Sequence, residues 1–292
     1  MSRMEIDDMK IARDVQLSRS LFLSGIVILL YDHLLTIGSE IQHIWVTTHK
    51  RSSIWFLIIR YFSFAGNIVM ALDTFGDFGL EVCGKLRVTT GLVIVAQELI
   101  IGCTLFLRVY ALYSLNRRIM YLLLCAGVVI VSVGAWSIVP VGLSPIVRTS
   151  APGCYVPQSK TQDLRMAAAW TGELAGDILV IGLTLYRSYT QRRNGVSFAG
   201  SLGRIMIRDG VVYFGIICLV NMANILMFYF GDIYTSNSLS WFTTAISVAM
   251  ISRLMLNLHV AATGEIGMVT DMEVETVRFL RRSGTDVASG GE

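Results

Sequence analysis

Seven long apolar stretches dominate this chain, and each of them is continuous. They lie near residues 18–38, 53–75, 88–112, 119–141, 165–189, 205–230 and 238–259. Lipid offers no hydrogen-bond partners, so a segment that crosses it must be a helix of about 20 apolar residues or a strand of a closed barrel. Barrel strands alternate apolar and polar residues over about 10 positions, which these stretches do not. The pattern therefore predicts an all-α, polytopic membrane protein, a seven-transmembrane helix bundle with receptor-like topology.

The composition agrees with a chain that lies mostly in lipid. Of its 292 residues, 54% are hydrophobic and only 15% are charged, whereas soluble domains have about 25% charged residues. The net charge of +3 is small, and no basic patch is interleaved with aromatic residues. We therefore expect the lipid bilayer as the main partner and no binding to nucleic acid.

Lysine and arginine in the short loops indicate the orientation, because cytoplasmic loops carry an excess of both. Loops one, three and five contain Lys50, Arg51, Arg117, Arg118, Arg192, Arg193 and Arg204. Loops two, four and six contain only Lys85, Arg87, Arg148 and Lys160. We expect an extracytoplasmic N-terminal segment (1–17), a transmembrane domain (18–259) and a cytoplasmic tail (260–292). Two interpretations of the tail stay open, a short surface helix and a disordered segment.

Two of the five cysteines are expected in extracytoplasmic loops. Cys83 precedes the third helix, and Cys154 lies in the long fourth loop. Thiols outside the cytoplasm oxidise readily, so we expect a Cys83–Cys154 disulfide, with two free thiols as the alternative. Cys103, Cys125 and Cys218 lie inside helices, where a small packing residue is the expected role.

Charged residues gather in the cytoplasmic half of the expected bundle. Ionisable groups at membrane depth are costly and usually pair inside the bundle. This candidate ionic layer comprises Asp32, Arg60, Arg108, Asp209 and Arg253. We expect Asp32 to pair with Arg60, and Asp209 with Arg108 or Arg253. Two interpretations remain, a structural lock that fixes the helix register and a switch at a cytoplasmic partner surface.

A second set of polar residues is expected nearer the midplane and in the outer half. Glu173 and Asp177 are four residues apart and so share one helix face. No Lys or Arg is expected at their depth, so these carboxyl groups should hold protons or bind a cation or a polar ligand. The expected cavity lies between helices three, five and six and is lined by Glu98, Glu173, Asp177, Asn221 and Asn224. The alternative is that these are hydrogen-bonded packing residues.

Several kinds of chemistry have no support in the sequence. None of the seven expected helices contains a lysine, which excludes a retinal Schiff base. The sequence has no phosphate-binding glycine loop, no nucleophile elbow and no clustered metal ligands. We therefore expect no enzyme activity, no cofactor and no metal. Three functions remain: a receptor-like sensor of an unknown small ligand with a cytoplasmic signalling partner, a proton- or cation-coupled small transporter, and a structural membrane protein.

Motifs in the ionic layer resemble those of one family. The first helix carries the run from Tyr31 to Thr36, followed by Glu40 and Trp45. Further motifs are Arg60-Tyr61, Arg108-Val109-Tyr110 and the run from Ser252 to Leu258. This combination resembles the fungal "domain of unknown function 6533" family of multi-pass membrane proteins, whose domain corresponds to about residues 23–66. The resemblance implies a fungal integral membrane protein and no particular activity.

Overall fold

The computed structural model describes residues 3–46, 51–138, 153–154, 159–193, 201–232 and 235–260. Within these ranges the chain is helical and has no strand. The elements are α1 (Arg3–Glu40), the π-helix η1 (Ile41–Trp45), α2 (Arg51–Phe75), α3 (Leu80–Leu112), α4 (Arg117–Ile138), α5 (Lys160–Arg193), α6 (Ser201–Phe230) and a seventh helix, Ser240–Val260. Seven of these helices are long and apolar enough to span a membrane, as predicted. Both interpretations of the tail stay predictions, because residues 261–292 lie outside the described residues.

Several helices extend beyond the apolar stretches that revealed them. The α1 helix has 38 residues, so it is about 57 Å long, nearly twice the hydrocarbon thickness of a bilayer. The expected N-terminal segment, 1–17, is helical from Arg3 and continuous with the first span, since it contains neither glycine nor proline. Because of these extensions, Lys10, Lys85 and Lys160 lie within α1, α3 and α5. All three lie outside the shorter helices that we expected to contain no lysine.

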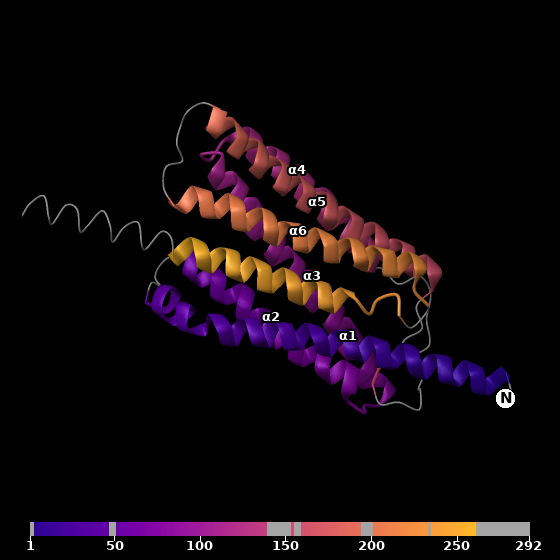
Figure 1. The fold of residues 1–292 in the computed structure, drawn as a ribbon. Coiled ribbons are helices and arrows are strands. Elements are labelled where there is room, and N and C mark those ends of the chain that lie inside the picture. The colour runs from indigo at the N-terminus through magenta and orange to yellow at the C-terminus, as the bar shows by residue number, and fades with distance from the viewer. Residues whose placement is uncertain are drawn as a thin grey trace, which may run out of the picture.

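The seventh helix occupies the centre of the bundle. In Figure 1 it runs, in yellow, between α6 on one side and α1 and α2 on the other. In its most apolar window 72% of the residues are buried, against at most 33% in the other spans. Small side chains permit this close packing. A Cβ on Gly25 of α1, for example, would lie 3.2 Å from the Cα of Phe242.

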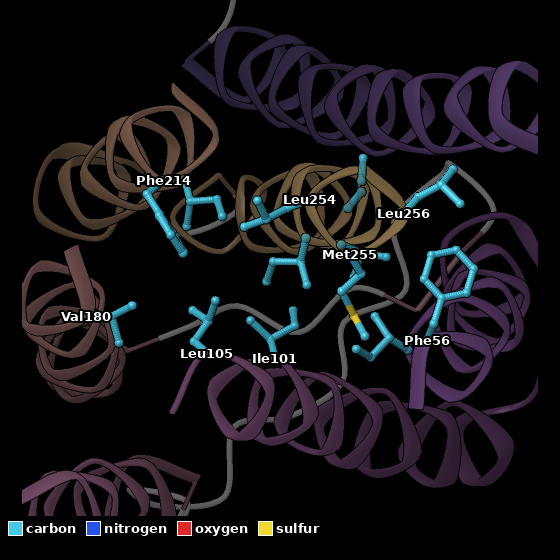
Figure 2. Packing of buried hydrophobic residues seen from close by; sticks show 14 of the residues in the cluster. Phe56, Ile101, Leu105, Val180, Phe214, Leu254, Met255 and Leu256 are labelled. Carbon is cyan, nitrogen blue, oxygen red and sulfur yellow. The ribbon is translucent and has the colours of Figure 1, made fainter. Parts of the chain in front are cut away.

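The largest apolar core lies on the seventh helix. Figure 2 shows Leu254, Met255 and Leu256 of this helix facing side chains of α2, α3, α5 and α6. The partners labelled there are Phe56, Ile101, Leu105, Val180 and Phe214. The seventh helix therefore packs against most of the bundle, so a shift of this helix would be transmitted to several others.

Candidate functional site

The expected disulfide is present and marks one end of the bundle, which we call the disulfide end. Cys83 in the first turns of α3 is bonded to Cys154, and both residues are buried. The backbone N–H of Cys154 also donates to the carbonyl of Asp73 at the end of α2, at 3.0 Å. Cys154 is thus fixed to two helices. The remaining cysteines, Cys103, Cys125 and Cys218, are free.

Toward the opposite end, Arg60 of α2 is held by groups of α1. Its Nε atom lies 3.1 Å from Glu40 Oε2 and donates to His33 Nδ1 at 2.7 Å. Its Nη2 atom donates to the His33 carbonyl at 2.9 Å and to Thr36 Oγ1 at 2.7 Å. Arg60 and Glu40 are both buried, so each compensates for the other's charge inside the bundle.

Glu40 is fixed by two aromatic donors besides Arg60. Its Oε1 atom accepts a hydrogen bond from Trp45 Nε1 and one from Tyr61 Oη, each at 3.1 Å. Trp45, five residues after Glu40, is the last residue of η1, a π-helix that begins directly after Glu40. Glu40 was not predicted to belong to the ionic layer, because it lies beyond the expected end of the first helix. The useful signal was an acid that follows that helix directly and has an aromatic residue five positions later.

Asp32 pairs with a different arginine from the one that we predicted. The Nε atom of Arg253, near the end of the seventh helix, donates to Asp32 Oδ1. The expected Asp32–Arg60 pair is wrong, because Arg60 takes Glu40 as its ion-pair partner instead. Asp32 is buried, whereas the Arg253 side chain is 36% exposed. We call the set Asp32, His33, Glu40, Arg60 and Arg253 the charged network.

The other two members of the predicted layer do not join this network. Arg108 of α3 is half-buried and forms no ion pair within the described part of the chain. The side chain of Asp209 lies outside the described residues, so its pairing stays a prediction. Arg253, one of the two arginines expected to pair with Asp209, pairs with Asp32 instead.

The structure brings the three predicted carboxyl groups together between α3, α5, α6 and the seventh helix. Glu98 Oε1 accepts a hydrogen bond from Thr244 Oγ1. Asp177 Oδ2 accepts one from Asn221 Nδ2 at 2.7 Å. Glu173 Oε1 approaches α3 at Gly102, 3.9 Å from the position that a Cβ would occupy there. The three carboxyl groups lie near enough to interact with one another electrostatically.

The surroundings of this carboxyl cluster (Glu98, Glu173 and Asp177) are polar, and no described residue pairs a cation with it. None of the ion pairs between described residues involves any of the three. Asn224, predicted for the same cavity, instead accepts a hydrogen bond from Ser240 at 3.3 Å. The described residues contain no group of three or more His, Cys, Asp or Glu side chains placed to hold a metal ion. Thr244 was not predicted, because one threonine gives no signal in a helix rich in serine and threonine.

Comparison with protein families supports the resemblance drawn from the motifs. Residues 20–65 match a family of unknown function, DUF6533. The matched stretch covers the later part of α1, all of η1 and the first part of α2. It includes Arg60 and every side chain that holds it, whereas Arg253 lies outside it. Comparison with curated proteins finds no match.

Proposed function

We propose that this multi-pass membrane protein is a receptor-like sensor. In this proposal a small ligand binds at the carboxyl cluster, and the charged network in the opposite half of the bundle responds. The proposed protein carries out no catalytic chemistry. Its output would be a change in the relative positions of helices, which a cytoplasmic partner would detect.

The observation that carries the proposal is that the seventh helix contacts both sites. Thr244 donates to Glu98 of the carboxyl cluster, and Arg253 donates to Asp32 of the charged network. The two residues are nine positions apart, a rise of about 13.5 Å along one rigid helix. A ligand that displaces this helix at Thr244 therefore acts directly on the Asp32–Arg253 contact. Two sites joined by one movable element are the minimal requirement for a switch.

The ligand that best fits the cluster is a small cation with N–H donors, such as a protonated amine. Three neighbouring carboxyl groups offer acceptor oxygens, and the described residues supply no positive partner. Carboxylates at membrane depth are stabilised when a cation or a proton compensates their charge. The amide of Asn221 and the hydroxyl of Thr244 would fix the orientation of the bound group.

The orientation proposed for the sensor follows from the loop charges. With the N-terminus outside, the disulfide end faces the exterior and the charged network lies in the cytoplasmic half. Loops three and five and the tail would then form the partner surface. Extracytoplasmic conditions also favour the disulfide that is present.

A proton- or cation-coupled transporter is the second candidate. It is favoured by the same three carboxyl groups, because carboxyl groups inside membrane bundles commonly mark ion and proton pathways. A transporter would move its ion across the membrane, whereas a sensor would change shape without flux. A structural membrane protein would do neither.

The three functions can be separated in one preparation. The protein is reconstituted in liposomes at pH 7 with a panel of protonated amines from methylammonium to trimethylammonium, and with Na⁺, K⁺ and choline, which have no N–H donor. Spin labels at the exposed positions Leu35 and Val260 report the distance between α1 and the seventh helix, after Cys103, Cys125 and Cys218 are replaced by alanine.

For a sensor we expect at least one cation of the panel to change this distance without flux. The change should be lost in Asp177→Asn and kept in Glu81→Gln, an exposed carboxyl of α3. Flux that depends on Asp177 would favour the transporter. A constant distance with no flux across the whole panel would contradict both.

A further inference from the structure

Three arginines of α4 and α5 gather at the end of the bundle opposite the disulfide. Arg117 and Arg118 are the first two residues of α4, and Arg187 lies near the end of α5. Arg117 and Arg118 are exposed, whereas Arg187 is partly buried. None of the ion pairs between described residues involves any of the three. We call Arg117, Arg118 and Arg187 the basic cluster.

Two contacts establish that α4 and α5 pack against each other in antiparallel directions. Near the start of α5, Gln162 Nε2 donates to the carbonyl of Ser137 near the end of α4, at 2.6 Å. Farther along, a Cβ on Gly176 of α5 would lie 2.8 Å from Cδ1 of Ile130 of α4. Figure 1 shows the two helices side by side.

This register brings Arg118 and Arg187 to the same level of the bundle. Arg118 precedes Ile130 by 12 residues, and Arg187 follows Gly176 by 11 residues. Because the helices are antiparallel, both arginines lie in the same direction from the Ile130–Gly176 contact, at about 18 and 16.5 Å along the helices. The lengths of two arginine side chains can therefore bring their guanidinium groups to one bound anion.

Arg118 lies on the side of α4 that faces α5. It is 18 residues before Trp136, and five turns of an α-helix separate residues that share a face. On that face, the ring of Trp136 packs against Arg165 of α5, whose Cζ atom lies 4.8 Å from the ring centre. At the disulfide end, α4 thus meets an arginine of α5 with an aromatic ring. At the opposite end it brings a second cation to the level of Arg187.

The helices supply no acid to compensate the basic cluster. The α4 helix contains no Asp or Glu, and α5 contains none after Asp177, ten residues before Arg187. Arg187 lies over the ring of Tyr113, 5.5 Å from its centre, but its buried Nε atom has no hydrogen-bond partner among the described residues. Arg117 and Arg118 also occupy the first turn of α4, where the helix dipole favours negative charge. A bound anion would offset each of these costs.

The position of the basic cluster favours a lipid head group as this anion. Arg117 begins the membrane span of α4, and Arg187 lies three residues before the end of the α5 span, so both are near head-group level. Leu122 and Val129, four and eleven residues after Arg118, share its helix face. Both are exposed and apolar, so they offer contact to an acyl chain that a free phosphate ion lacks.

We propose that Arg118 and Arg187 bind the phosphate of an anionic phospholipid between α4 and α5. Arginine is suited to phosphate because its planar group presents several N–H donors, and stacking on Tyr113 fixes Arg187 in place. Arg117 adds positive charge at the same end. A zwitterionic lipid fits less well, because its own cation already compensates its phosphate. This site is separate from the carboxyl cluster and does not depend on the sensor proposal.

Native mass spectrometry tests the proposal on the unmodified protein. The full chain in detergent is titrated with phosphatidylglycerol, an anionic lipid, and with phosphatidylcholine of the same acyl chains. We expect the first phosphatidylglycerol to bind at least about fivefold more tightly. Equal affinities would overturn the proposal. Inorganic phosphate in about tenfold excess over the lipid should leave the bound lipid in place, since it lacks the acyl contacts. Displacement would identify free phosphate as the occupant and would also overturn the proposal.

Two double variants with the same change in net charge locate the bound lipid. Arg118→Gln with Arg187→Gln should weaken phosphatidylglycerol binding at least about fivefold and leave phosphatidylcholine binding unchanged. The control, Lys10→Gln with Lys85→Gln, removes two exposed cations near the disulfide end and should change the affinity less than about twofold. Equal weakening in both would mean that the lipid responds only to net charge, and would overturn the proposal.

A single exposed substitution keeps the test decisive if the first double variant does not fold. Arg118→Gln alone changes an exposed side chain of α4 and should weaken phosphatidylglycerol binding at least about twofold. The matched control is Lys85→Gln, which removes one exposed cation of α3. An Arg118→Gln variant that binds phosphatidylglycerol as tightly as this control would contradict the assignment.

Discussion

Arg253 donates a hydrogen bond to Asp32, which joins the end of the seventh helix to the first helix across 221 residues of sequence. The acid is buried, whereas the arginine is about one third exposed. The second ion pair of the network, Glu40–Arg60, is buried on both sides. We therefore expect the Asp32–Arg253 pair to be weaker than the Glu40–Arg60 pair, and to be the one that breaks when the helices move.

Glu40→Gln should be among the most destabilising single changes in the charged network. It leaves the buried guanidinium of Arg60 without its counter-charge, which costs about 3–5 kcal/mol. Denaturant unfolding of the purified protein measures this cost. Combining it with Arg60→Met should recover much of the loss, while the exposed control Glu81→Gln should stay within about 0.5 kcal/mol of the wild type. A Glu40→Gln variant as stable as that control would contradict the assignment.

Loss of the disulfide should weaken the protein by up to about 4 kcal/mol. Cys83 and Cys154 are 71 residues apart, and a bond that closes a loop of this length strongly restricts the unfolded chain. The Cys83→Ala, Cys154→Ala double variant is compared with the Cys103→Ala variant, which removes a free thiol. Thermal melting with and without a reductant checks the prediction. A reductant should lower the melting temperature of the Cys103→Ala variant and leave that of the double variant unchanged.

Glu173→Gln should stabilise the protein in the absence of ligand. The change replaces one of three neighbouring carboxyl groups by a neutral amide of nearly the same volume, and so removes the cost of keeping that acid at membrane depth without a cation. A rise of about 2–4 °C in melting temperature at pH 7.5 corresponds to about 1 kcal/mol. The Glu173→Gln variant should also lose its response to cations, because residues that bind a ligand often destabilise the free protein. A drop in melting temperature would show that Glu173 is a packing residue with a required hydrogen bond.

Tyr113, just after α3, should make stability depend on pH in the alkaline range. Its hydroxyl donates to the Leu183 carbonyl at 2.9 Å, and burial raises the pKa of Tyr113 above its usual value. The protonated hydroxyl is thus favoured in the folded state, so its contribution is complete below about pH 10 and is lost as pH rises through the higher folded pKa. Tyr113→Phe should cost about 1 kcal/mol at pH 9 and less at pH 11.

The matched control for Tyr113 is Tyr121→Phe, which changes an exposed tyrosine of α4. Equilibrium unfolding of both variants and the wild type at the two pH values provides the comparison. An identical cost of Tyr113→Phe at pH 9 and pH 11 would argue against the hydrogen bond to Leu183.

Much of the fold could be predicted from hydropathy, because lipid imposes length and apolarity on every span. The ends of the helices could not be predicted from hydropathy, because α1 continues through polar residues outside its apolar stretch. The disulfide was predictable because alternating spans place the second and fourth loops, and so Cys83 and Cys154, at the same end of the bundle. Hydropathy therefore locates residues along the membrane normal but says little about the polar flanks.

The pairing of the charged residues was only partly predictable. Asp32, Arg60 and Arg253 were expected at similar depth, and depth does not reveal which arginine faces Asp32. The rotation of each helix about its axis decides that, and packing of the central seventh helix fixes this rotation. Glu40 was missed because the π-helix η1 follows it directly where the prediction had placed a loop.

The central claim is that the seventh helix couples the carboxyl cluster to the charged network, and a double-mutant cycle tests it without any ligand. Thr244→Val removes the contact with Glu98, and Asp32→Asn weakens the contact with Arg253. The free energy of unfolding is measured for the two single variants, the double variant and the wild type. Independent sites separated by more than about 10 Å give additive changes within about 0.5 kcal/mol. Coupling through the seventh helix predicts an interaction energy above about 1 kcal/mol, and strict additivity would contradict it.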